Sequence, residues 1–149
     1  MSKRILFSSL IGAVALGALA AGGLALASTP TELTLDRGTA RYTAPSDDSA
    51  GSLIYTVDVS DDSGIRGLKV VAWPASSKLG PTEAELRSAE SAKCRSASDE
   101  IARCTYTLKV TKREAAELPM GTWYVSALAT AKDGDTTFVP SAAVFDLTR

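Results

Sequence analysis

The sequence contains no histidine, no asparagine and no glutamine. Without histidine, the chain lacks the commonest general base and metal ligand, and it cannot build a Ser-His-Asp or Cys-His catalytic arrangement. Without asparagine it has no N-glycosylation site, and its turns must rely on Asp, Ser and Gly. Glycine-rich phosphate loops and the Gly-x-Ser-x-Gly nucleophile motif are also missing. These absences predict a protein that is not an enzyme.

An excess of charge of one sign is also lacking, because 16 Lys and Arg residues stand against 17 Asp and Glu residues. Nucleic-acid-binding domains usually carry a clear basic surplus or a basic stripe. No nucleic-acid partner is therefore expected. At 149 residues, the chain has the length of a single domain.

The N-terminus has the pattern of a secretory signal peptide. Lys3 and Arg4 are followed by an uncharged stretch that ends only at Glu32, and small residues precede the junction between Ala27 and Ser28. A small-x-small sequence of this kind suits cleavage after Ala27. The uncharged stretch is also long enough to cross a bilayer, so an uncleaved membrane anchor is the alternative. Its richness in Ala and Gly favours cleavage.

This pattern divides the chain into three parts. We expect residues 1–27 to be the signal peptide, residues 28–44 to form a tether and first strand, and residues 45–149 to form the folded domain. The expected product is a secreted, extracellular monomer, which would contact a membrane only if the signal segment were an uncleaved anchor.

Cysteine is scarce, with only Cys94 and Cys104 present. In an oxidising compartment a single pair predicts a disulfide rather than a metal or redox site. Closing so short a loop contributes roughly 2.5–3 kcal/mol in the chain-entropy model. A bridge-closed loop that carries Arg95 and Arg103 can also present a cationic anchor to a trypsin-like protease, so a small secreted protease inhibitor is one alternative function.

Alternating apolar and polar residues predict short strands separated by turns. The clearest case places Leu53, Tyr55, Val57 and Val59 on one face. The segments predicted to form strands, this one included, are residues 33–44, 52–59, 65–73, 103–111, 122–131 and 136–149. Since no helices alternate with these strands, the pattern predicts an all-β fold, an antiparallel two-sheet sandwich of about seven strands.

Helices are expected at only two places. In the long Pro74–Arg103 connection, Thr82 and Glu85 have the spacing of a capping box, which predicts a short helix. The segment from Lys112 can hold one helical turn before Pro119 ends it.

Two stretches carry a resemblance to known proteins: VDVSDDSGIRGLKVVAW and LPMGTWYVSALATAKDGDTTFVPSAAVFDL. Both resemble segments of bacterial immunoglobulin-like and fibronectin-type-III-like modules. With the Ala/Gly-rich signal peptide, the chain resembles small secreted actinobacterial proteins of unknown function built on one such domain. The resemblance covers roughly residues 52–147 and implies that the all-β antiparallel sandwich is immunoglobulin-like, without implying site residues.

Two acidic turns supply candidate metal ligands. Asp58, Asp61 and Asp62 lie around one turn, and Asp133 and Asp135 lie in another. In an immunoglobulin-like sandwich these turns meet at one end, where several carboxylates suit Ca²⁺. The competing interpretation is that aspartate is an ordinary turn residue in a chain without asparagine.

The combined expectation is a secreted, non-enzymatic binding or cell-envelope-associated module whose partner is an unknown extracellular protein or cell-wall ligand. Besides the inhibitor, the alternative is a calcium-dependent carbohydrate- or wall-binding domain. Trp73 and Trp123 would form its aromatic platform if both were exposed, although aromatic residues more often lie in a sandwich core.

Overall fold

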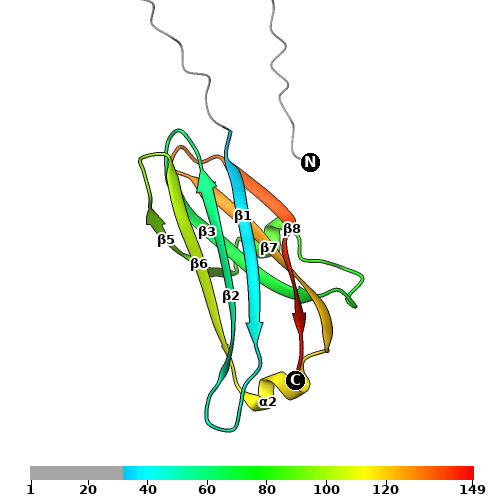
Figure 1. Cartoon of the computed structure of the whole chain (residues 1–149). Coiled ribbons are helices and arrows are strands. Elements are labelled where there is room, and N and C mark those ends of the chain that lie inside the picture. The colour runs from blue at the N-terminus through cyan, green and yellow to red at the C-terminus, as the bar shows by residue number, and fades with distance from the viewer. Residues whose placement is uncertain (1–31) are drawn as a thin grey trace, which may run out of the picture.

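The computed structural model describes residues 32–149, so the expected signal peptide and the Ala27–Ser28 cleavage site lie outside the described residues. The described chain forms two four-stranded antiparallel sheets packed face to face (Figure 1). The first sheet has the order β1-β2-β6-β5. Its strands are β1 (Thr34–Thr43), β2 (Gly51–Ser60), β6 (Ile101–Val110) and β5 (Lys93–Ser96).

The second sheet has the order β4-β3-β7-β8. Its strands are β4 (Glu90–Ser91), β3 (Ile65–Pro74), β7 (Gly121–Ala131) and β8 (Thr136–Leu147). The same strand orders occur in immunoglobulin-like sandwiches, here with the short β4 added at one edge. The predicted all-β antiparallel sandwich is confirmed. Residues 32–149 contain eight strands rather than about seven, because the Pro74–Arg103 connection contributes both β4 and β5.

The hydrophobic core lies between the sheets and is supplied by alternate residues of the long strands. In β2, the residues Leu53, Tyr55, Val57 and Val59 are each at most 3% exposed. Complete burial of a Val or Leu side chain stabilises a fold by roughly 1.5–3 kcal/mol. A shift of one residue in the pairing of β2 would turn this whole row to solvent, so the alternation also fixes the register.

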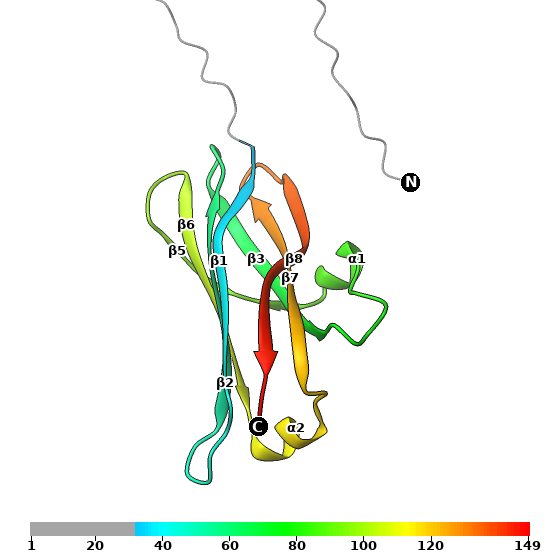
Figure 2. The same cartoon turned by 45° about the vertical axis from the view of Figure 1, so that its right-hand side comes forward.

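Helix α1 (Glu83–Leu86) lies in the Pro74–Arg103 connection, as predicted. The Thr82 side chain accepts a hydrogen bond from the Glu85 amide, and the Glu85 carboxylate accepts one from the Thr82 amide. The helix lies against the outer side of β3 and β7 (Figure 2). Leu86 is fully buried there, and Leu128 of β7, on the outer face of the sheet, is only 3% exposed.

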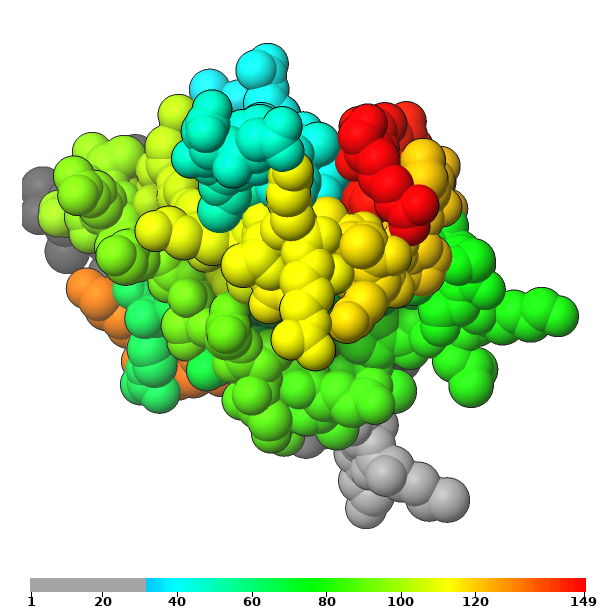
Figure 3. Space-filling model, turned by 90° about the horizontal axis from the view of Figure 1, so that it is seen from below, coloured from blue at the N-terminus to red at the C-terminus, as the bar shows by residue number. Residues whose placement is uncertain are grey.

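Helix α2 (Lys112–Glu117) closes the lower end of the sandwich between β6 and β7. Thr111 and Glu114 cap it with a second capping box. Seen from below, α2 lies across this end beside the β1–β2 turn and the C-terminus (Figure 3). Across residues 32–149 no helix combines the length and the apolar character needed to span a bilayer.

Candidate functional site

The β2–β3 turn and the β7–β8 turn meet at the upper end of the sandwich in Figure 1. The Lys132 amide donates to the Gly64 carbonyl at 2.9 Å, and the Asp133 amide donates to the Ser63 hydroxyl at 3.2 Å. The Arg66 guanidinium donates to the Lys132 carbonyl at 3.0 Å. The two acidic turns are therefore bonded to each other, as the sandwich topology predicts.

Three of the five predicted metal ligands come together at this end. Asp61, Asp133 and Asp135 each place a carboxylate oxygen within 4.8 Å of the other two. All three also fit the interpretation as turn residues. Oδ1 of Asp61, a residue only 1% exposed, accepts hydrogen bonds from the Ser63 amide at 2.8 Å and the Ser63 hydroxyl at 2.5 Å. Oδ1 of Asp133 accepts from the Asp135 amide at 3.0 Å. The turn role is observed, and the calcium site stays a prediction.

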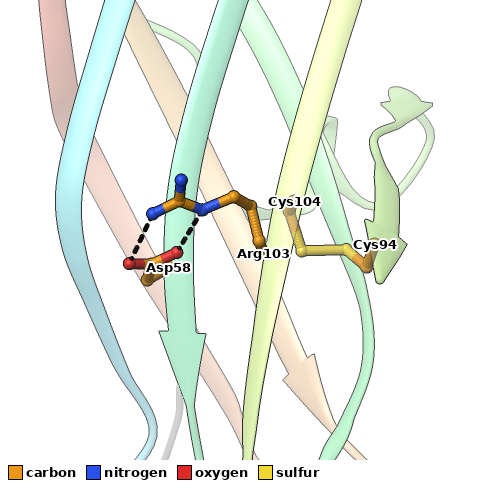
Figure 4. The surroundings of a disulfide bond; sticks show 4 residues. All are labelled: Asp58, Cys94, Arg103 and Cys104. Atoms are coloured by element: carbon orange, nitrogen blue, oxygen red, sulfur yellow. Dashed lines mark hydrogen bonds and ion pairs between the residues drawn. A yellow bond between two sulfur atoms is a disulfide. The ribbon is translucent and has the colours of Figure 1, made fainter. Parts of the chain in front are cut away.

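Asp58 and Asp62 lie outside this group of three. Asp62 is exposed in the β2–β3 turn. Asp58 stands opposite Arg103 on β6, which donates from Nε to Oδ1 at 2.8 Å and from Nη2 to Oδ2 at 3.0 Å (Figure 4). Arg37 adds an ion pair at 3.4 Å. The Arg103 hydrogen bonds, with the two positive charges, hold the pKa of Asp58 below its usual range. Asp58 is thus an ion-pair partner across the first sheet.

The predicted disulfide between Cys94 and Cys104 is present and joins directly opposite residues of β5 and β6 (Figure 4). The bridge-closed segment is a β-hairpin, and Cys104 is fully buried. Of the two expected protease anchors, Arg103 is held by Asp58, and Arg95 is exposed on β5. The bridge therefore fastens a four-residue edge strand to the sheet.

The two tryptophans lie on opposite faces of the second sheet. Trp123 is 7% exposed in the core, where its indole N–H donates to the Pro119 carbonyl at 2.8 Å. Trp73 lies on the outer face, where its N–H donates to the Ser126 hydroxyl at 2.9 Å and its ring lies 5.0 Å from that of Tyr124. They do not form a common aromatic platform.

An apolar pocket of about 560 Å³ opens between the two sheets in the half of the sandwich that lies toward α2. In this half β3 runs away from β6 in both views of the ribbon (Figures 1 and 2). Strand β5 pairs only with residues 102–105 of β6, so the rest of β6 has no neighbour on that side within the described chain. The volume lies within the usual range for small-molecule sites, roughly 300–1,000 Å³.

The residues that line this pocket differ from those of a closed core. Leu108 shares the inward face of β6 with the buried Tyr106 and Val110, yet it is 38% exposed. The hydroxyl of Tyr42, another lining residue, is buried without a hydrogen-bond partner in the described chain. Glu90 is the one charged residue among the described residues that line the pocket. It accepts a hydrogen bond from the Tyr106 hydroxyl at 2.9 Å.

A second cavity, of about 620 Å³, adjoins the apolar pocket. Tyr106 and Glu90 line both cavities. The second cavity, called the basic groove below, is also lined by Lys93, Arg95 and Arg103. Burial, helped by the hydrogen bond to Glu90, raises the pKa of Tyr106 to about 12, so this phenol stays a neutral donor at the boundary between the two spaces.

The comparisons with known proteins give one match. Residues 35–129 match the model of a family of unknown function, DUF5707. The chain belongs to this family. Neither a curated protein nor a solved structure matches it. The segment shared with DUF5707 begins in β1 and ends in β7, so it includes the disulfide, the acidic β2–β3 turn and the strand positions around Leu108.

Sequence reasoning about this DUF5707 chain missed the pocket. Leu108 and Val110 have the same place in the alternation, which predicts one inward face for both, and nothing in the neighbouring sequence distinguishes a covered position from an open one. The sequence does contain a signal for the adjoining basic groove. In KCRS (residues 93–96), two cationic residues flank a cysteine. Alternation places the cysteine inward and both cations outward, on the face that forms the basic groove.

Proposed function

We propose that this protein is an exported, non-enzymatic binding module that holds an apolar small molecule in the pocket between its sheets. The observation that carries the proposal is the exposed, inward-facing Leu108 in a pocket of about 560 Å³. Small-molecule sites typically have this size and are lined by apolar side chains with a few polar groups. Exposing such a surface without a ligand has a cost in hydration free energy that binding removes.

The polar groups of the pocket suit recognition rather than chemistry. Glu90 with Tyr106 stands at its boundary, and the Tyr42 hydroxyl is buried without a partner in the described chain. No histidine exists in the chain to act as a base.

Export is part of the same proposal. The signal-like N-terminus, the resemblance to small secreted proteins and the Cys94–Cys104 disulfide all favour an oxidising, extracellular location. The mass of the protein recovered from the medium tests this directly. We expect a chain that begins at Ser28 with both cysteines oxidised, and an intact N-terminus on a membrane-bound product would contradict it.

Ligand binding is tested with the protein's own fluorescence. The chain has two tryptophans, of which Trp123 lines the pocket and Trp73 does not, so the Trp73→Phe variant reports on the pocket alone. A bromine-labelled decanol, which quenches indole fluorescence on contact, serves as the neutral apolar probe. We expect saturable quenching of Trp123.

A blocking variant and its matched control complete the test. Ala72 lines the pocket and is half-buried, so Ala72→Phe fills the space, whereas Ala50→Phe adds the same side chain on the exposed β1–β2 turn. Ala72→Phe is expected to weaken binding by about tenfold or more while Ala50→Phe leaves it unchanged. Quenching that does not saturate, or that is equal in the two variants, would overturn the proposal.

A further inference from the structure

The apolar pocket and the basic groove share a wall. Tyr106 on β6 and Glu90 on β4 line both spaces, and the hydrogen bond between them joins the two sheets. A ligand that entered the pocket past this wall would have its outer end at the groove. The side chains of the groove would then select the chemistry of that end.

The groove is positively charged. Lys93 and Arg95 are exposed on β5, and neither forms an ion pair within residues 32–149. Arg103 is already neutralised by Asp58, so the unpaired positive charge comes from the other two residues. Against them stands one carboxylate, that of Glu90, which is occupied by the Tyr106 hydroxyl. This excess of positive charge favours an anion in the groove.

The disulfide fixes the position of these two cations. Cys94 lies between Lys93 and Arg95, and its bridge to Cys104 holds β5 against β6 beside the boundary with the pocket. Lys93 pairs with Thr105 and Arg95 with Arg103 in the sheet, so both cations lie on the same outer face. Pre-positioned charges lose less conformational entropy when they bind than charges on a mobile loop.

We infer that the ligand is an anionic amphiphile, with its apolar part between the sheets and its phosphate or carboxylate beside Lys93 and Arg95. This inference rests on the proposed function. Glu90 gives the ligand its orientation, because a negative side chain at the boundary keeps an anionic headgroup out of the apolar space and in the groove.

The experiment compares three probes with the same chain: decyl phosphate, decyltrimethylammonium and decanol, each below its critical micelle concentration. Binding is followed by Trp123 fluorescence in the Trp73→Phe protein, with brominated analogues of each probe. We expect decyl phosphate to bind about tenfold more tightly than decanol, as two exposed ion pairs would give, with an advantage that falls as salt rises.

The variant Lys93→Gln with Arg95→Gln is expected to lose this preference and to bind decanol as before. Arg41→Gln, which removes an exposed cation from β1 at the far edge of the same sheet, is the matched control and is expected to keep the preference. An oxidised disulfide and an unchanged melting temperature show that the double variant is folded. Glu90→Gln is expected to tighten the binding of decyl phosphate.

The outcomes separate the two proposals. If none of the three probes binds saturably, the proposed function fails. If decanol binds but decyl phosphate binds no better, or keeps its advantage in the double variant, the anionic ligand alone is overturned. A preference for decyltrimethylammonium that Glu90→Gln abolishes would also overturn it.

The source of the anion is tested with vesicles. Co-sedimentation with phosphatidylglycerol vesicles that decyl phosphate competes away, and that the double variant loses, would assign the anion to a membrane lipid. Binding of decyl phosphate without co-sedimentation would assign it to a dispersed amphiphile. Both results support an anionic amphiphile.

Discussion

Tyr55 carries a polar atom into the centre of the sandwich. Its side chain is fully buried in β2, and its hydroxyl has no hydrogen-bond partner in the described chain. The hydroxyl lies under β1 at Gly38, where an added Cβ would lie 3.4 Å from it and 2.9 Å from the Ala142 carbonyl. At Gly38, therefore, any larger residue would force β1 away from β8. Burial raises the pKa of Tyr55 to about 12.

This raised pKa predicts a loss of stability in alkali. Between pH 10, the usual value for tyrosine, and pH 12 the folded state keeps a proton that the unfolded state has lost, so the free energy of unfolding falls as pH rises. The loss is about 2–3 kcal/mol by pH 12 and is absent below pH 10. Tyr55→Phe is expected to remove it and, at pH 8, to leave stability unchanged or raise it by about 1 kcal/mol.

Urea unfolding at pH 8 and in steps to pH 12 measures both effects. Tyr124→Phe, on the outer face of the second sheet, is the matched control. Tyr106, whose raised pKa acts in the same direction, contributes equally to all three proteins. If the free energy of unfolding falls as much between pH 10 and pH 12 in Tyr55→Phe as in the unaltered protein, the buried hydroxyl is not the source of the loss.

The acidic turns raise a second question at the residue scale. Asp135 contributes a carboxylate to the group of three, and this carboxylate accepts no hydrogen bond within residues 32–149, so Asp135→Asn removes charge with little structural change. If the group binds calcium, millimolar Ca²⁺ raises the melting temperature of the unaltered protein and not of Asp135→Asn. Asp48→Asn, in the exposed β1–β2 turn, is expected to keep the shift. If Ca²⁺ does not change the melting temperature, these residues have the turn role alone.

At the scale of elements, β5 is the strand that depends most on a covalent bond. It has four residues, pairs with one neighbour, and is followed by a tight turn back into β6. The few backbone hydrogen bonds between β5 and β6 are not enough to hold an edge strand in place. The Cys94–Cys104 disulfide supplies the additional constraint.

Removing the bridge therefore has an effect on stability and an effect on binding. Cys94→Ala with Cys104→Ala is expected to lower the free energy of unfolding by roughly 2.5–3 kcal/mol. Because β5 carries Lys93 and Arg95, the same variant is expected to lose the preference for decyl phosphate over decanol. Denaturant unfolding and the fluorescence titration measure the two effects, and a preference that survives would show that β5 stays in place without its bridge.

The long strands and both helices could be predicted because their signals are local. Alternation along residues 52–59 and the Thr82–Glu85 spacing need no knowledge of the rest of the chain. Strands β4 and β5 could not, because two and four residues are too few to establish a period, and β4 pairs with a strand about 20 residues away along the chain. The pairing of Asp58 with Arg103 depends on the register of β2 and β6, and the exposure of Leu108 depends on where β5 begins, opposite Thr105.

The two ends of the whole molecule differ in how they are closed. At the upper end three turns are bonded together, since the Asp61 amide donates to the Glu100 carbonyl and the Lys132 amide donates to the Gly64 carbonyl, both at 2.9 Å. Toward the lower end the pocket opens between the sheets, and residues 107–110 of β6 pair with β2 alone. We therefore expect the upper end to open less readily than the lower half, where the proposed ligand would enter between the sheets.

Hydrogen exchange along one strand tests this difference. We expect amides in the lower half of β6, residues 107–110, to exchange about tenfold faster than those in residues 102–105, because local opening needs fewer contacts to break there. Decyl phosphate is expected to slow exchange in the lower half and to leave the upper half unchanged, since a ligand stabilises only the contacts that its binding requires. Ala72→Phe, which fills the same space from within, is expected to give similar protection without any ligand. Uniform exchange along β6, or protection by decyl phosphate at the upper end, would show that the pocket is not where the molecule opens.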